Sequence, residues 1–116
     1  MTEIASHAAA SNRGGLTILH ELDAQGVVLV LTGELDLVSA PELDRQVRAL
    51  GGASHGRLLI DLSGLEFMDS TGLASMIHAQ RSAAANGHEL SLRRGPDQVQ
   101  RLLELTGLSG QFTFEQ

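Results

Sequence analysis

Apolar residues recur along the chain with two periods, which predict strands and helices in alternation. Five segments alternate between apolar and polar residues or are apolar throughout, as β-strands are. They cover residues 16–22, 27–33, 57–63, 89–94 and 111–115. Three other segments repeat apolar residues every three or four positions and predict amphipathic helices, which begin near Ser39, Thr71 and Asp97. The order β-β-α-β-α-β-α-β predicts an α/β single domain, with helices packed on a mixed, mainly parallel β-sheet.

Turn and capping residues indicate where these elements end and how they connect. The turn residues at 23–26 predict that the first two strands form an antiparallel hairpin. The second and third strands should be parallel, because a helix lies in the connection between them. Ser39 and Glu42 have the spacing of a capping box at the first helix. Residues 1–15 predict a flexible N-terminal tail, and residues 16–116 the folded domain.

The composition excludes several classes of function. The chain has 116 residues, a formal net charge of −6, no Cys and no Lys. The lack of Cys excludes thiolate nucleophiles, and the lack of Lys excludes a Walker A loop. The negative charge argues against nucleic acid and anionic membranes as partners, and no apolar run is long enough to span a bilayer. We expect a cytoplasmic protein with no metal or cofactor, since it has no signal-peptide pattern, phosphate loop or EF-hand spacing.

One short stretch concentrates the candidate chemistry. Asp69, Ser70, Thr71 and Gly72 lie where the third strand meets the second helix. Any of the first three can cap that helix by accepting a hydrogen bond from a free backbone N–H. A hydroxyl at a helix N-terminus is also placed where free N–H groups and the helix dipole would hold a phosphate, and Gly72 has no side chain to block it. A helix cap and a phosphorylation site therefore both remain open for Ser70.

Asp36 is a second candidate, at the end of the second strand. The carboxyl ends of parallel strands meet at one edge of a sheet, so Asp36 and the stretch 69–71 should face the same side. Asp36 could also cap the first helix. A serine hydrolase is a poor interpretation of Ser70, because Met68 stands where the nucleophile motif G-x-S-x-G has its first Gly.

Three segments, TGELDLVSAPEL, LIDLSGLEFMDSTGL and RLLELTGL, resemble the anti-sigma factor antagonists of the STAS-domain family. The resemblance covers about residues 16 to 115, in order and with matching spacing. It implies a small β-sheet with helices packed on it. It also implies that Ser70, directly after the motif Asp, is phosphorylated. Thr71 then holds a position where the family allows Ser or Thr, and Asp36 matches the family's G-E-[LI]-D motif near the phosphosite.

The resemblance also implies a set of partners. In such proteins, a cognate anti-sigma factor that is also a serine kinase binds the unphosphorylated antagonist, and the sigma factor is released. Phosphorylation, here of Ser70, prevents binding, and a serine phosphatase reverses it, so the antagonist is a substrate and not an enzyme. Ala74-Ser75 replaces the commoner Gly-Val and changes the surface of the second helix beside the site. The alternative is a STAS adaptor or scaffold subunit of a larger assembly or transporter, in which Ser70 is only a cap.

Overall fold

The computed structural model describes residues 9–50 and 56–115, and within them six strands form one sheet in the order β1-β2-β3-β4-β5-β6. The strands are β1 (Ala9–Arg13), β2 (Leu16–Asp23), β3 (Gly26–Leu35), β4 (Gly56–Met68), β5 (His88–Arg93) and β6 (Thr113–Glu115). The helices are α1 (Ala40–Leu50), α2 (Ser70–Ala85) and α3 (Asp97–Leu105), and a 3-10 helix, η2 (Ser109–Gln111), precedes β6.

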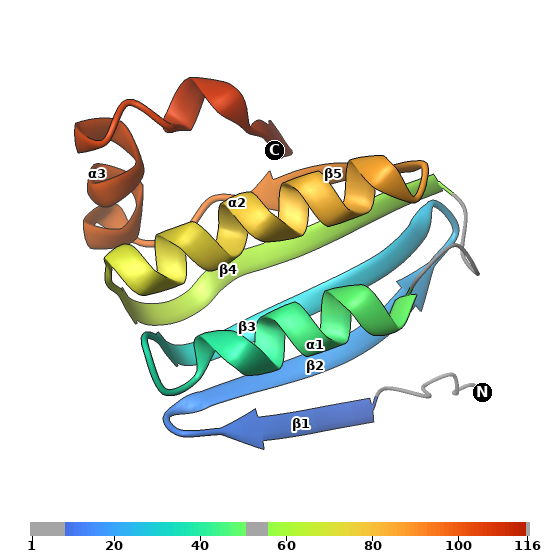
Figure 1. The fold of residues 1–116 in the computed structure, drawn as a ribbon, viewed down its shortest axis with the longest axis horizontal. Helices are drawn as coiled ribbons and strands as arrows, with labels where there is room; N and C mark the ends of the chain where they lie inside the picture. The colour runs from blue at the N-terminus through green and yellow to red at the C-terminus, as the bar shows by residue number, and fades with distance from the viewer. Residues whose placement is uncertain (1–8, 51–55, 116) are drawn as a thin grey trace.

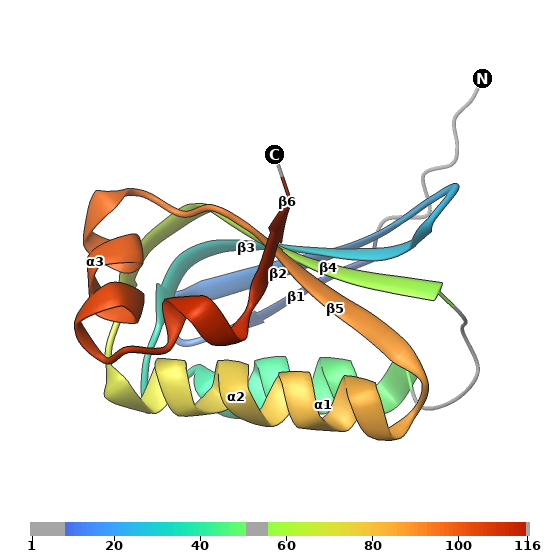
Figure 2. The same ribbon diagram turned by 90° about the horizontal axis from the view of Figure 1, so that it is seen from above.

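The sheet combines an antiparallel and a parallel half. β1, β2 and β3 pair antiparallel, whereas β3, β4, β5 and β6 pair parallel. Helices α1 and α2 lie side by side on one face of the sheet, and α3 lies toward one end (Figures 1 and 2). The predicted mixed, mainly parallel sheet with helices packed on it is therefore confirmed.

The hydrophobic core fills the space between the sheet and the two long helices. Alternating apolar residues of β2, β3 and β4 turn toward the helices, as a period of two requires. The buried strand residues include Leu16, Ile18, Leu29, Leu31, Leu58 and Ile60. The buried helix residues include Leu43, Val47, Leu73, Met76, Ala79 and Ala83. The small Ala79 and Ala83 on the inner face of α2 allow that helix to lie close to the sheet.

The structure differs from the sequence prediction at residues 9–13, which form strand β1 instead of part of a tail. Ala9–Arg13 pair antiparallel with the first half of β2. The Ser11 hydroxyl also accepts a hydrogen bond of 3.1 Å from the Gln46 amide of α1. These partners are distant in sequence, so the short polar segment shows no strand pattern of its own. The remaining part of the predicted tail, residues 1–8, lies outside the described residues.

Two other strands differ from prediction in length. β4 continues beyond residue 63 to Met68, whereas β6 is reduced to three residues because residues 109–111 form η2. The extension of β4 runs beside the end of β3, where the register shifts between Val30 and Thr32 and between Gly33 and Glu34. The longer β4 brings Phe67 and Met68 to the edge of the sheet at which α2 begins.

The predicted capping box at α1 is not formed. The Ser39 N–H donates to the Asp36 carboxylate at 3.1 Å, and the Ser39 hydroxyl donates to the Glu34 carbonyl at 2.8 Å. Glu42 instead turns along its own helix, where its carboxylate accepts hydrogen bonds from Arg45 and Gln46. A charged partner one turn away satisfies the Glu42 carboxylate more strongly than a neutral backbone N–H would.

Glu42 is a nearly buried carboxylate whose charge the fold stabilises. Its side chain is 9% exposed, and its carboxylate oxygen lies 2.6 Å from a guanidinium nitrogen of Arg45. Hydrogen bonding to Arg45, with further bonds from Gln46 and Ser11, lowers the pKa of Glu42 from an ordinary 4.5 to about 2. The ionised form therefore stabilises the fold fully above pH 4.5, and this contribution is lost as the pH falls through about 2.

Replacing Glu42 with Gln should lower the free energy of unfolding at neutral pH by about 1 to 3 kcal/mol, because hydrogen bonds to a charged acceptor are lost. Urea unfolding at a series of pH values measures this. The difference between wild type and Glu42→Gln should shrink as the pH falls from about 4.5 to about 2, where Glu42 itself becomes protonated. A difference that does not change with pH would contradict this account.

Candidate functional site

The carboxyl ends of β3 and β4 meet at one edge of the sheet. Their last residues, Leu35 and Met68, are register partners in the parallel pair. Asp36 and Asp69 follow directly, and the Asp69 N–H donates a hydrogen bond of 3.3 Å to the Leu35 carbonyl. The structure thus brings Asp36 and the stretch 69–71 to the same edge, which is where parallel pairing should place them.

Asp69 is the residue that caps α2. Its carboxylate accepts a hydrogen bond of 2.9 Å from the Gly72 N–H, and its backbone is extended. Ser70 is the first helical residue and is exposed, and its hydroxyl makes no hydrogen bond to any residue in the described ranges. The cap is therefore Asp69, and the Ser70 hydroxyl is left accessible to solvent.

Thr71 occupies a different environment from Ser70. It is half-buried and lines a groove between α1 and α2, together with Leu37, Ala74 and His78. The neighbouring Ser75 is buried, and its hydroxyl donates to the Ala40 carbonyl of α1 at 3.4 Å. Of the pair Ala74-Ser75, Ala74 is therefore the residue that changes the surface beside the site.

Gly72 is required for close packing. A Cβ atom at this position would lie 2.3 Å from the Leu35 carbonyl oxygen and 2.9 Å from side-chain carbons of Leu35 and Met68. No other residue allows α2 to begin so close to the end of β3. The sequence interpretation, in which Gly72 leaves room for a phosphate, is thus incomplete, because the missing side chain faces the strand ends.

The carboxylate of Asp36 organises its own loop. It accepts hydrogen bonds of 3.1 Å from the Val38 N–H, the Ser39 N–H and the Ser39 hydroxyl. The Asp36 carbonyl also accepts a bond of 2.8 Å from the Ala40 N–H at the start of α1. Asp36 therefore fixes the conformation of residues 36–39, beside the N-terminus of α2.

Apolar side chains around this edge are exposed, which the sequence analysis did not anticipate. Leu37 is 71% exposed, Val38 58% and Phe67 48%. Leu37 and Val38 come from the β3–α1 loop and Phe67 from the end of β4. A group of large apolar side chains in water is typical of a surface that contacts another protein. The feature of the sequence that could have predicted this surface is the apolar pair Leu37-Val38, which directly follows Asp36 in a loop.

Three carboxylates at this edge have no ion-pair partner among the described residues. Asp36 and Asp69 follow the two strand ends, and Glu66 precedes Phe67 on β4, whereas Asp44 of the adjoining groove is paired with Arg48. A partner that docks here is therefore best matched by basic and apolar groups.

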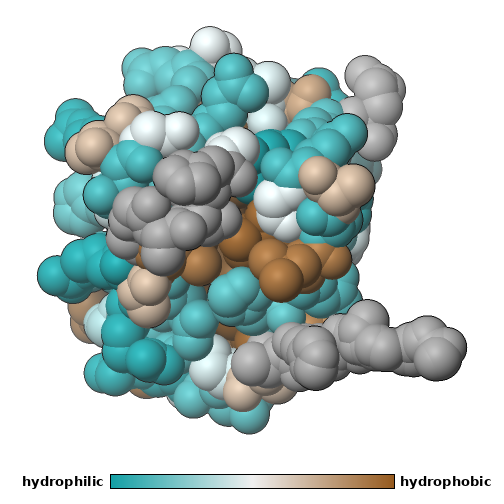
Figure 3. All heavy atoms as spheres, turned by 90° about the vertical axis from the view of Figure 1, so that its right-hand side faces the viewer, coloured by the Kyte–Doolittle hydropathy of each residue, from teal (hydrophilic) through white to brown (hydrophobic). Residues whose placement is uncertain are grey.

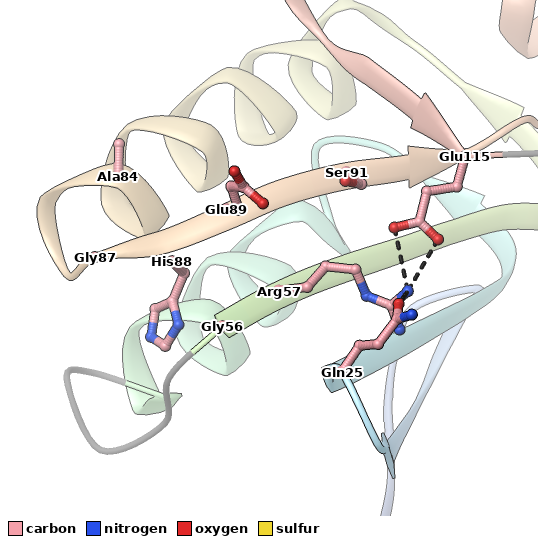
Figure 4. Close-up of a pocket in the computed structure, with 9 residues that line it drawn as sticks. All are labelled: Gln25, Gly56, Arg57, Ala84, Gly87, His88, Glu89, Ser91 and Glu115. Atoms are coloured by element: carbon pink, nitrogen blue, oxygen red, sulfur yellow. Dashed lines mark hydrogen bonds and ion pairs between the residues drawn. The ribbon is translucent and has the colours of Figure 1, made fainter.

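A second pocket lies at the opposite end of the sheet, where the parallel strands begin (Figure 4). Arg57 of β4 extends toward Glu115, with which it forms an ion pair of 3.0 Å, and it also binds Asp23 and Gln25. Arg57 is thus neutralised by two carboxylates and is not available to an anionic ligand. Figure 3 faces this end, where polar residues surround a small apolar area. We conclude that Arg57, Glu115, Asp23 and Gln25 have a structural role, because their bonds connect β4 to β6 and to the β2–β3 turn.

Comparison with known families decides the identity of the fold. The family model described as "Mlab, STAS domain" matches residues 18–114, which is most of the chain. The chain belongs to the STAS-domain family. In this STAS domain, the described residues contain no helix that is both long and apolar enough to cross a membrane. The same residues contain no group of three or more His, Asp or Glu side chains arranged to hold a metal ion.

Relatives of this STAS domain include anti-sigma factor antagonists. The anti-sigma-B factor antagonist of Listeria monocytogenes is 33% identical over 91 residues, which cover 78% of this chain and 80% of that protein. The crystal structure of an anti-sigma factor antagonist from Mycobacterium paratuberculosis has a TM-score of 0.71 and 31% identity, and the match covers 85% of this chain and 84% of that one.

A more distant structure shares the fold. The Bacillus cell fate determinant SpoIIAA, solved in its phosphorylated form, has a TM-score of 0.63 and 20% identity to this STAS domain. The match covers 85% of this chain and 91% of that one.

The assignment of the cap predicts unequal effects of neighbouring substitutions. Asp69→Ala should lower the free energy of unfolding by about 1 kcal/mol, because the Gly72 N–H loses its partner. Ser70→Ala should change it by less than about 0.5 kcal/mol, because the Ser70 hydroxyl is exposed. Urea unfolding measures both. Asp69→Asn, which keeps a capping oxygen, is the control, and a Ser70→Ala loss as large as that of Asp69→Ala would show that Ser70 is the cap.

Proposed function

We propose that this STAS domain is an anti-sigma factor antagonist that binds its anti-sigma factor when Ser70 is unphosphorylated and loses that binding when Ser70 is phosphorylated. The observation that carries the proposal is the division of roles at the start of α2. Asp69 caps the helix, so the exposed Ser70 hydroxyl has no structural task. Relatives named as anti-sigma factor antagonists, at about a third identity over most of their length, support the class.

The burial of the two adjacent hydroxyls favours Ser70 over Thr71 as the phosphorylated residue. A kinase must bring the acceptor oxygen in line with the γ-phosphoryl group of ATP, so the hydroxyl has to enter the active site of the kinase. Ser70 is exposed, whereas Thr71 is half-buried in the wall of the groove. The Ser70 oxygen then forms the new bond to phosphorus, ADP leaves, and the hydroxyl proton passes to a base of the kinase.

A phosphate on Ser70 would change the charge of the edge much more than its shape. It adds about −1.5 to −2 charges and three acceptor oxygens. The N-terminus of α2 is a favourable place for that charge, because its first N–H groups and the helix dipole attract anions. For a partner, however, the phosphate adds to the negative field of Asp36 and Asp69 and occupies space at the edge that carries the exposed apolar residues. We therefore expect the phosphate to block binding locally, without refolding the domain.

The kinase and the phosphatase are partners in the same proposal. The anti-sigma factor supplies the kinase activity, and a serine phosphatase that removes the phosphate from Ser70 restores binding. This STAS domain contributes no catalytic residue to either reaction and acts as a substrate and a binding module. An adaptor of the same family would bind its assembly without regard to ATP or to the state of Ser70.

Incubation with ATP and each candidate anti-sigma kinase from the same genome should add a single phosphate, which peptide mapping should place on Ser70. Intact-mass measurement detects the addition. Ser70→Ala should remain unmodified, whereas Thr71→Val, the matched control, should still gain the single phosphate. If no candidate modifies the protein and one still binds it, the adaptor function replaces the phosphorylation switch.

Binding of the same anti-sigma factor should follow the charge at position 70. Ser70→Ala should bind with wild-type affinity, and Ser70→Asp should bind roughly tenfold more weakly or worse, since a carboxylate mimics part of the charge of a phosphate. Titration calorimetry measures both affinities. Ser82→Asp, which adds the same charge near the other end of α2, is the control. Equal weakening by Ser82→Asp would attribute the effect to net charge instead of to the site.

A further inference from the structure

The turn between β1 and β2 packs against the loop that carries the exposed Leu37 and Val38. Because β2 runs antiparallel to β3, the β1–β2 turn lies at the same end of the sheet as the β3–α1 loop (Figure 1). The Arg13 guanidinium nitrogen Nε donates a hydrogen bond of 2.8 Å to the Val38 carbonyl. This bond joins two segments that lie 25 residues apart in the chain.

Two glycines allow this close contact. Gly14 has a φ of +59°, and a Cβ atom there would lie 3.0 Å from a methyl carbon of Val38. A Cβ atom on Gly15 would lie 3.0 Å from the carboxylate of Glu34, and the Gly15 carbonyl accepts a bond of 3.1 Å from the Glu34 N–H. The turn therefore touches both ends of the β3–α1 loop, and larger residues in the turn would push the loop away.

The β3–α1 loop is consequently restrained from two sides. Asp36 holds it from within, through the Val38 N–H, the Ser39 N–H and the Ser39 hydroxyl. Arg13 holds it from outside, through the Val38 carbonyl. The result is that Leu37 and Val38, which are 71% and 58% exposed, are kept in a defined conformation in water.

Holding exposed apolar side chains in place is useful for binding. A loop that is ordered before it meets its partner loses less conformational entropy in the complex. Leu37 also lines the groove that contains Thr71, so the loop and the start of α2 form a continuous surface beside Ser70. An apolar site with basic surroundings on the partner would match Leu37, Val38 and the nearby carboxylates.

We infer that Arg13 is a positioning residue for partner binding: from the N-terminal hairpin, it holds Leu37 and Val38 in the conformation that contacts the anti-sigma factor. The inference rests on the proposed function and extends it to β1. It implies that Arg13 acts through the loop, so its loss weakens binding while the fold and the Ser70 hydroxyl remain intact.

Three variants test this role with the anti-sigma factor that phosphorylates Ser70. Arg13→Met keeps the length of the side chain and removes its donors, and should raise the Kd for that factor roughly three- to tenfold. Arg13→Lys restores a donor and should recover most of the affinity. Arg81→Met removes the same charge from an exposed arginine that makes no bond to the described residues, and should leave the Kd unchanged.

Two further measurements separate positioning from a general loss of stability. Amide hydrogen exchange at Val38 and Ser39, whose N–H groups bind Asp36, should accelerate in Arg13→Met and stay at the wild-type rate in Arg13→Lys. The thermal unfolding midpoint should be the same in all three variants within a few degrees.

The results distinguish failure of the inference from failure of the proposed function. If wild type binds and Arg13→Met binds equally well, Arg13 has no positioning role and the proposed function stands. Equal weakening in Arg81→Met would show an effect of charge alone and would also overturn the inference. If wild type neither binds nor is phosphorylated by any candidate, the proposed function fails, and the role of Arg13 in binding fails with it.

Discussion

The parallel pairing of β3 and β4 is the constraint on which the candidate site depends. Both strands are rich in buried apolar residues, and their register places Leu35 opposite Met68. Because β3 and β4 end at paired residues, the residues that follow them, Asp36 and Asp69, lie next to each other. A shift of one residue in this register would turn the side chains of one strand to the opposite face and expose part of the core. The burial of the core therefore also determines where the site residues lie.

The two carboxylates of this small site, Asp36 and Asp69, both have structural roles, because each binds backbone N–H groups. Asp36 holds the β3–α1 loop, and Asp69 holds the first turn of α2. A carboxylate that accepts backbone hydrogen bonds satisfies donors that a helix start or a tight loop otherwise leaves unpaired. This arrangement leaves the adjacent hydroxyl of Ser70 uncommitted, and an uncommitted, exposed hydroxyl is what a modifying enzyme requires.

The sequence was sufficient to predict the fold class and the edge of the sheet on which the candidate residues lie. Both depend on strong periodic patterns, such as those of residues 27–33 and 57–63, and on the rule that parallel strands end at the same edge. The sequence was insufficient to predict β1. Residues 9–13 have no strand pattern of their own, and they form a strand because they contact β2 and α1. The capping box failed for a related reason, since Ser39 and Glu42 both had stronger partners nearby.

Within the site, the sequence left the choice between Asp69, Ser70 and Thr71 as the cap open, and three-dimensional geometry was needed to make it. The exposure of Leu37 and Val38 was equally inaccessible, because an apolar pair in a loop can be buried or exposed depending on what packs against it. Here Arg13 bonds to the Val38 carbonyl and Gly14 of the β1–β2 turn lies close to one methyl of Val38, yet Leu37 and Val38 both stay more than half exposed.

The contact between Gly72 and Leu35 has a consequence for the kinetics of any signal sent through this edge. The start of α2 lies in direct contact with the strand ends, so the helix cannot move closer to them. Under the proposed function, the domain keeps this shape and changes only its charge. Such a device needs no slow conformational step of its own, so the time for which a signal lasts would be set by the enzymes that add and remove the phosphate. The state of the signal would be recorded only by the presence or absence of one covalent bond, between the Ser70 oxygen and phosphorus.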